Sequence, residues 1–97
     1  GVSRLRLRVL ESARSDLLEI KAWLTQPGSG RRAWARYSAV VQAVIDLRSG
    51  SHRWPFGDQA DVRERPIEGY RIYYRVDDGQ GQVEILRIFA PGQDRRL

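Results

Sequence analysis

Arginine and apolar residues alternate at the start of the chain, where the segment 4–10 reads RLRLRVL. The alternation places Leu5, Leu7 and Val9 on one face and arginines on the other. A period of two is typical of a half-buried strand. We therefore predict the first strand over this segment, with its arginines directed toward solvent.

A helical period replaces the alternation after Ser12, which is a plausible N-cap because its hydroxyl can accept a free backbone N–H. Proline and glycine at Gln26–Gly30 would end this helix, which is predicted over roughly 13–25. Its apolar stripe consists of Ala13, Leu17, Ile20 and Leu24, widened by Leu18 and Trp23.

A second amphipathic segment, 31–49, is predicted to be a helix that ends at a left-handed C-cap glycine, Gly50. The two helices are joined by a short loop and should form an antiparallel hairpin that packs on a sheet. The stripe of the second helix comprises Trp34, Tyr37, Val41, Val44 and Ile45, bordered by Ala33, Val40 and Leu47.

Three strands are predicted in the second half of the chain. A short one covers 61–65 and is stopped by Pro66, the next covers 70–76, and the last covers 82–90 after the turn 77–81, which is rich in Asp and Gly. In the last strand, Val83, Ile85 and Phe89 are expected to share a face with Arg87, opposite Leu86 and Ile88. The order β-α-α-β-β-β predicts an α+β fold with a helical hairpin on one face of a mainly antiparallel sheet.

Length and composition narrow the class of protein. Ninety-seven residues with 41% hydrophobic and 30% charged residues predict one folded domain over 1–97. No apolar run approaches the ~18 residues of a membrane span. The segment 1–5 lacks the continuous apolar region of a secretion signal, so we expect a cytoplasmic protein that does not bind membranes. The chain has no cysteine and one histidine, His52, so we expect no disulfide, no metal site and no cofactor.

Charge is the most informative bulk property. The formal net charge is +5, and all but one of the 17 basic residues are arginine, the exception being Lys21. A planar guanidinium binds phosphate and carboxylate well, which favours a polyanionic partner such as a nucleic acid or an acidic protein. A genome rich in G and C would also produce many arginine codons, and composition alone leaves both explanations open.

No familiar catalytic motif is present, so the candidate chemistry lies on the predicted sheet. Arg71, Tyr73 and Arg75 alternate onto one face, and Arg87 on the next strand can lie beside them. Clustered guanidiniums can bind phosphate while a tyrosine stacks on a base. The alternative is a solvated face on which these arginines pair with Glu64 and Glu84. Arg63 and Arg65 would extend the cluster from the preceding strand.

The tryptophans are candidate anchors for a partner protein. Trp34 lies on a helical stripe and is expected in the core, whereas Trp23 flanks a stripe and Trp54 lies in a loop. Either core packing or partner binding fits the latter two. His52 is interpreted as an ordinary loop residue.

Three stretches that together span most of the chain resemble ParE/RelE-type toxins of bacterial toxin–antitoxin systems. SARSDLLEIKAWL (12–24) resembles their first helix, and YSAVVQAVIDLRSGSHRWPFG (37–57) resembles their second helix and the loop after it. VRERPIEGYRIYYRVDDGQGQVEILRIFAPGQDRR (62–96) resembles their closing hairpin. The resemblance implies a growth-arresting toxin that forms a hetero-oligomer with an antitoxin.

The resemblance leaves the mechanism open between two branches. ParE-like members poison DNA gyrase and are neutralised by a ParD-like antitoxin. The first-helix segment and the strands YYRV and ILRIF favour this branch. RelE-like members are endoribonucleases that cut messenger RNA on the ribosome, but the ending APGQDRRL lacks their tyrosine or histidine, and Gln93 lies near where a basic residue is expected. A non-toxic binding module of the same fold is a third possibility.

The resemblance also implies residue roles for each alternative. An endoribonuclease of this type would use Arg71, Tyr73, Arg75, Arg87 and Arg95. For a ParE-like protein we expect no catalytic residue. An antitoxin is expected to bind at Trp23, Trp34, Trp54, Arg71, Arg75 and Arg87.

Overall fold

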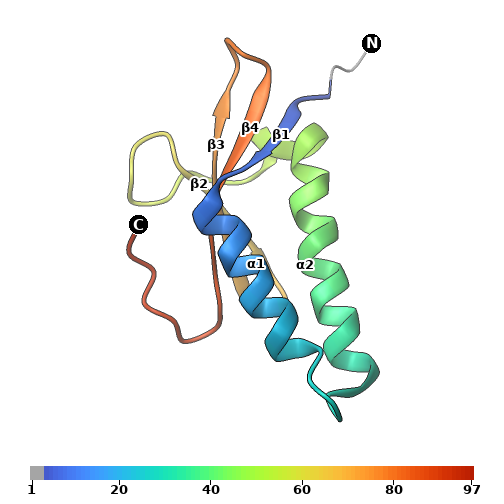
Figure 1. Cartoon of the computed structure of the whole chain (residues 1–97). Helices are drawn as coiled ribbons and strands as arrows, with labels where there is room; N and C mark the ends of the chain where they lie inside the picture. The colour runs from blue at the N-terminus through green and yellow to red at the C-terminus, as the bar shows by residue number, and fades with distance from the viewer. Residues whose placement is uncertain (1–3) are drawn as a thin grey trace.

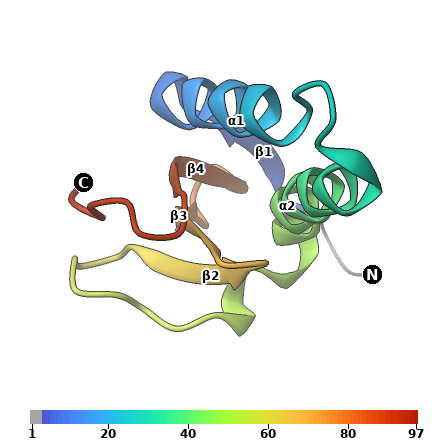
Figure 2. The ribbon, with the colours of Figure 1, turned by 90° about the horizontal axis from the view of Figure 1, so that it is seen from below.

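A four-stranded sheet with the strand order β1-β4-β3-β2 carries two helices on one face in the computed structural model of the chain (Figures 1 and 2). The structure describes residues 4–97, so the first three residues of the expected signal-free N-terminus lie outside the described residues. The elements are β1 (Arg6–Val9), α1 (Glu11–Leu24), α2 (Gly30–Gly50), the 3-10 helix η1 (Ser51–Arg53), β2 (Arg63–Ile67), β3 (Tyr70–Asp77) and β4 (Gln82–Phe89). The predicted α+β order is confirmed.

β1 precedes both helices in the chain, and the helical hairpin connects it to the other three strands of the sheet. β1 pairs in parallel with β4, whereas β2, β3 and β4 pair antiparallel, so the sheet is mainly antiparallel. The core lies between helices and sheet, and its largest fully buried side chains include Tyr74, Leu47, Ile72 and Ile85. No helix within residues 4–97 is long and apolar enough to cross a membrane.

The helix boundaries differ from prediction at both predicted caps. α1 begins at Glu11 with Leu10 as its N-cap, and the exposed Ser12 makes no capping hydrogen bond. The reason is that the Leu10 N–H is bonded to the Ile85 carbonyl and the Leu10 carbonyl accepts the Arg14 N–H, so sheet pairing leads directly into the helix. The end of the second helix also differs, because Gly50 has φ −120° and the chain continues into η1.

The buried stripe of α2 is displaced from the predicted one. The residues that meet the core are Val40, Ala43, Val44 and Leu47, two of which were expected only at its border. Trp34 is 52% exposed and Ile45 43% exposed, so the expectation that Trp34 is a core residue is wrong. The apolar stripe of this helix is wider than the surface that the sheet and α1 cover, and periodicity alone does not locate its buried centre.

Pro66 lies within β2 rather than ending it. The strand runs to Ile67, and Pro66 is paired in register with Arg71. A proline cannot donate to a sheet ladder, but β2 is an edge strand, and the loop segment 55–57 pairs with its outer side at Arg63 and Glu64, before Pro66. A turn follows, with Glu68 at φ 51° and Gly69 at φ 84°.

An irregularity in β4 reverses the predicted faces at its end. Tyr73 is opposite Arg87 and Tyr74 is opposite Ile85, so Leu86 has no counterpart on β3. A bulge of this kind switches the alternation of side chains. Val83 and Ile85 therefore share the helix-covered face with Ile88, and Phe89 faces the other side with Arg87.

Candidate functional site

The sheet face opposite the helices, here called the open face, holds the predicted arginine–tyrosine cluster. Arg71, Tyr73 and Arg75 alternate with the buried Tyr70, Ile72 and Tyr74 along β3, as expected from the sequence. Arg71 lies 3.8 Å from Glu64, and the Arg75 Nε lies 3.1 Å from a Glu84 oxygen. The pairing with Glu64 and Glu84 that the sequence left open is therefore present.

Arg87 belongs to this face by register but its guanidinium is bound elsewhere. It is paired with Tyr73 across the strands, and it donates hydrogen bonds of 2.7 and 3.0 Å to the two oxygens of Asp16 on α1. The hydrogen bond from Arg87 to Asp16 raises the pKa of Arg87 above its usual value, although partial burial opposes this shift. Arg87 thus connects the sheet to α1 rather than joining Arg71 and Arg75.

Asp16 was missed by the sequence analysis. It is 6% exposed, and one of its oxygens also accepts the Ile88 N–H at 2.8 Å. The sequence feature that could have indicated its burial is its position on α1, three residues after Ala13 and four before Ile20, inside the apolar stripe. A buried carboxylate is retained only where it is paired and hydrogen-bonded, which is the case here.

Tyr73 is a partly buried polar group on the open face. Its ring packs edge-on against Phe89 with the centroids 5.2 Å apart. Burial raises the pKa of Tyr73, and a hydrogen bond to Glu64 raises it further, while the charges of Arg95 and Arg71 oppose the shift. The phenol is therefore a proton donor at neutral pH and a poor base.

The C-terminal segment brings Arg95 to Tyr73. A turn over Ala90–Gln93 has Gly92 at φ 78°, and the Gln93 side chain accepts the Ala90 N–H at 2.9 Å. This turn returns the chain to a cavity of about 240 Å³ lined by Gly57, Asp58, Gln59, Val62, Glu64, Tyr73, Arg95, Arg96 and Leu97. Arg95 and Tyr73 therefore share a cavity, as the endoribonuclease alternative requires.

Arg63 and Arg65 do not extend the open-face cluster. They are paired in register with Tyr74 and Ile72, whose side chains point to the core. Arg63 lies 4.0 Å from the centre of the Phe56 ring, and Arg65 lies 4.8 Å from the Trp54 ring and donates to the Ala43 carbonyl. These two arginines hold the loop after η1 and the edge strand against α2.

The three tryptophans have different environments. Trp23 is 68% exposed and lines a cavity of about 170 Å³ with Ile20, Tyr70 and Ile88. Trp34 is exposed on α2, with Tyr37 packed edge-on against it. Trp54 packs on the core beneath Arg65. Trp23 and Trp34 are thus available to a partner over most of their surface.

His52 is exposed and its Nε2 lies 3.7 Å from Asp78. Within residues 4–97, no cluster of His, Cys, Asp and Glu has the arrangement of a metal site.

Several solved structures share this arrangement of helices and strands. The RelBE2 complex from Mycobacterium tuberculosis matches with 24% identity and a TM-score of 0.68. The match covers 90% of this chain and 98% of that chain. The chromosomal ParDE system of P. aeruginosa matches with 20% identity, 91% and 97% coverage and a TM-score of 0.73. A mutant of the E. coli toxin RelE in the free state matches with 13% identity, 90% and 83% coverage and a TM-score of 0.64.

These matches show that the chain has the RelE/ParE-like fold. No curated protein sequence matches the chain. The sequence profile described as the ParE toxin of the type II toxin–antitoxin system parDE matches residues 7–95. The chain belongs to the ParE toxin family.

Proposed function

We propose that this chain arrests growth by trapping DNA gyrase on DNA, without catalytic chemistry of its own. The observation that supports this best is the pairing of the three candidate arginines with carboxylates, Arg71 at 3.8 Å, Arg75 at 3.1 Å and Arg87 at 2.7 Å. Cleavage of RNA requires donors preorganised toward the charge that develops on phosphate. Arg87 is bound to Asp16 and does not join Arg71 and Arg75, so the three guanidiniums do not converge on one phosphate.

The gyrase proposal is tested with purified components. Toxin, gyrase and supercoiled plasmid are incubated with ATP, and the products are denatured with detergent before electrophoresis. Linear DNA with covalently attached gyrase is the expected product. Unchanged supercoiling together with no trapped cleavage complex would contradict the proposal.

A ParD-like antitoxin is proposed to neutralise this toxin. Trp23 and Trp34 would anchor its apolar side chains because both rings are largely exposed on the helices. Trp54 and the arginines Arg71, Arg75 and Arg87 would contribute cation–π and charge-assisted contacts with acidic side chains. The similar RelBE and ParDE structures are toxin–antitoxin systems, which supports a hetero-oligomer here.

A ribosome-dependent endoribonuclease is the second candidate function. The observation in its favour is the cavity that Tyr73 shares with Arg95 and Glu64. Primer extension on messenger RNA after induction would reveal cleavage, and Arg71→Ala and Tyr73→Phe would each reduce it. Toxicity that is unchanged by both substitutions, without new RNA ends, would exclude this candidate.

A non-toxic binding module of the same fold is the remaining alternative. Expression of the chain without its antitoxin distinguishes this binding-module alternative from the two proposed toxic activities. Growth arrest would exclude a function limited to binding, whereas normal growth with a soluble, folded chain would contradict both proposed toxic activities.

A further inference from the structure

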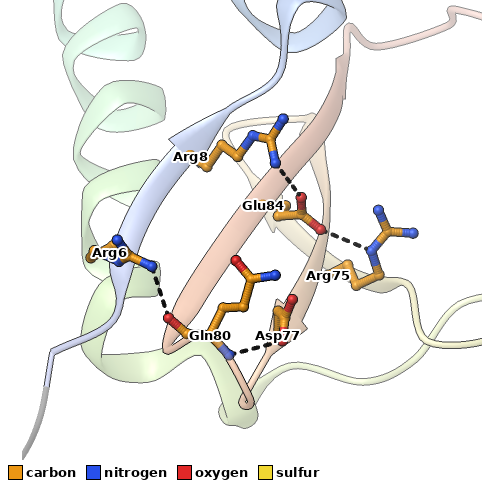
Figure 3. A network of polar contacts seen from close by, with 6 residues as sticks. All are labelled: Arg6, Arg8, Arg75, Asp77, Gln80 and Glu84. Atoms are coloured by element: carbon orange, nitrogen blue, oxygen red, sulfur yellow. Dashed lines mark hydrogen bonds and ion pairs between the residues drawn. The ribbon is translucent and has the colours of Figure 1, made fainter.

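One end of the open face holds a cross-strand triad of Arg8, Glu84 and Arg75, and the functions above use neither Arg8 nor Glu84. Glu84 of β4 is paired in register with Arg8 of β1 on one side and with Arg75 of β3 on the other. The Arg8 Nη1 lies 3.4 Å from one carboxylate oxygen, and the Arg75 Nε lies 3.1 Å from the other (Figure 3). A single carboxylate therefore positions two guanidiniums that approach it from opposite strands.

The two arginines remain accessible while the carboxylate does not. The side chain of Glu84 is 12% exposed, whereas those of Arg8 and Arg75 are 61% and 46% exposed. Arg75 binds Glu84 through Nε, so its two terminal nitrogens have no hydrogen-bond partner within residues 4–97. The triad carries an excess positive charge that points toward solvent.

Arg6 extends this charge along β1. It lies two residues before Arg8, on the same face, and donates to the Gln80 carbonyl at 3.0 Å (Figure 3). Asp77 lies across the sheet, opposite Gln82, and accepts the Gln80 N–H in the hairpin turn. Asp61, Asp77 and Asp78 line a cavity with Arg75. We call Arg6, Arg8 and Arg75 around Glu84 the arginine bracket.

We propose that the arginine bracket binds the phosphodiester backbone of duplex DNA. Exposed guanidiniums held in fixed positions are well suited to phosphate oxygens, which they bind in a bidentate manner. A complementary peptide segment would also need apolar contacts, but Leu18, Trp23, Trp34 and Ile45 lie on the helices. Phe56 is 58% exposed and lines a cavity with Arg75, but Arg63 covers one face of its ring. The bracket therefore favours a nucleic acid over an acidic protein.

The absence of a stacking platform favours a duplex over a single strand. Proteins bind single strands with exposed aromatic rings, and no aromatic residue belongs to the bracket. The Phe56 ring shares a cavity with Arg75, but Arg63 is stacked on it at 4.0 Å. The inference is independent of the gyrase proposal, since it concerns direct contact between this chain and DNA.

The test measures the binding of a fluorescently labelled 20-base-pair DNA duplex to the purified chain by anisotropy at several salt concentrations. The bracket variant combines Arg6→Ala, Arg8→Ala and Arg75→Ala with Glu84→Gln, so that no buried carboxylate is left unpaired. It removes three positive charges and one negative charge, which lowers the net charge from +5 to +3. The matched control, Arg31→Ala with Arg32→Ala on exposed positions of α2, also has a net charge of +3.

We expect the bracket variant to lose at least about tenfold in affinity and the control less than about twofold. Three phosphate contacts predict a slope of log affinity against log salt of about −2.7 for the parent, reduced in the bracket variant. If the bracket variant does not fold, Arg6→Ala alone replaces it, with an expected loss of about threefold.

Separate binding measurements use single-stranded RNA and polyglutamate as alternative ligands. Tighter binding of either than of the duplex would overturn the assignment, as would equal losses in the bracket variant and the control, or no binding of the duplex by the parent. Because gyrase is absent, failure here leaves the plasmid assay as an independent test of the gyrase proposal.

Discussion

Arg87 and Asp16 join the last strand to the first helix through two hydrogen bonds of 2.7 and 3.0 Å between residues 71 positions apart. Asp16 also caps the Ile88 N–H at the edge of β4. β1 pairs with β4 only as far as Ile85, so the Asp16 carboxylate accepts the Ile88 N–H where β1 no longer pairs with β4. A side chain of α1 thus completes the edge of the sheet.

Substitution of Asp16 should destabilise the fold. Asp16→Ala leaves the Arg87 guanidinium and the Ile88 N–H without their partner, and we expect a loss of about 2–4 kcal/mol. Urea unfolding followed by circular dichroism measures this loss. The control is Glu19→Ala, an exposed carboxylate one turn along the same helix, which should change stability by less than about 0.5 kcal/mol. Equal effects of the two substitutions would contradict the role given to Asp16.

Tyr74 should make stability depend on alkaline pH. Burial raises the pKa of Tyr74 to about 12, while the charges of Arg63 and Arg65 oppose the shift. The folded state then keeps the phenolic proton at a pH where the unfolded state releases it. The contribution of Tyr74 is therefore complete below pH ~10 and decreases toward pH ~12, by about 1.4 kcal/mol at pH ~11.

Tyr74→Phe isolates this contribution. The variant should be less stable than the parent at pH ~8 by about 1 kcal/mol, because the Ser51 carbonyl loses its donor. The difference should shrink as the pH approaches 11, and urea unfolding at both pH values measures it. Tyr37→Phe serves as the control. A stability difference that does not vary with pH would contradict the shifted pKa.

Gly57 and Gly50 should respond oppositely to alanine. A Cβ on Gly57 would overlap the Glu64 carboxylate, whereas a Cβ on Gly50 has open space around it. Gly57→Ala should cost about 1 kcal/mol or more and move Glu64 away from Tyr73. Gly50→Ala should stabilise the chain by about 0.4–1 kcal/mol through the unfolded state. Thermal unfolding measures both, and a tolerated Gly57→Ala would contradict the close approach.

Trp23 should matter for binding and little for stability. Its side chain is largely exposed, so Trp23→Ala is expected to change stability by less than about 0.5 kcal/mol. An interface anchor of this type contributes about 2 kcal/mol or more, which corresponds to an antitoxin affinity at least about 30-fold weaker. Titration calorimetry with the cognate antitoxin measures the affinity, and Leu18→Ala on the same helix is the comparison. An unchanged affinity would exclude Trp23 from the interface.

The sequence by itself determined the elements and their order. The alternation of Leu5, Leu7 and Val9 and the helical spacing of Ala13, Ile20 and Leu24 depend on local geometry, and the elements they predicted were found. The alternation in β3 likewise placed Arg71, Tyr73 and Arg75 on one face. Such patterns are readable because each reports the period of a single element.

Tertiary structure decided how these elements meet. The bulge at Leu86 changes which face Phe89 occupies, and nothing in the local pattern marks the residue that lacks a partner. Asp16 resembles any helical carboxylate until Arg87 is brought to it from the far end of the chain. Likewise, Arg8 and Arg75 are separated by most of the sequence, and the register of two different strands against Glu84 places them together. Pairings of this kind depend on long-range register, which a one-dimensional pattern does not encode.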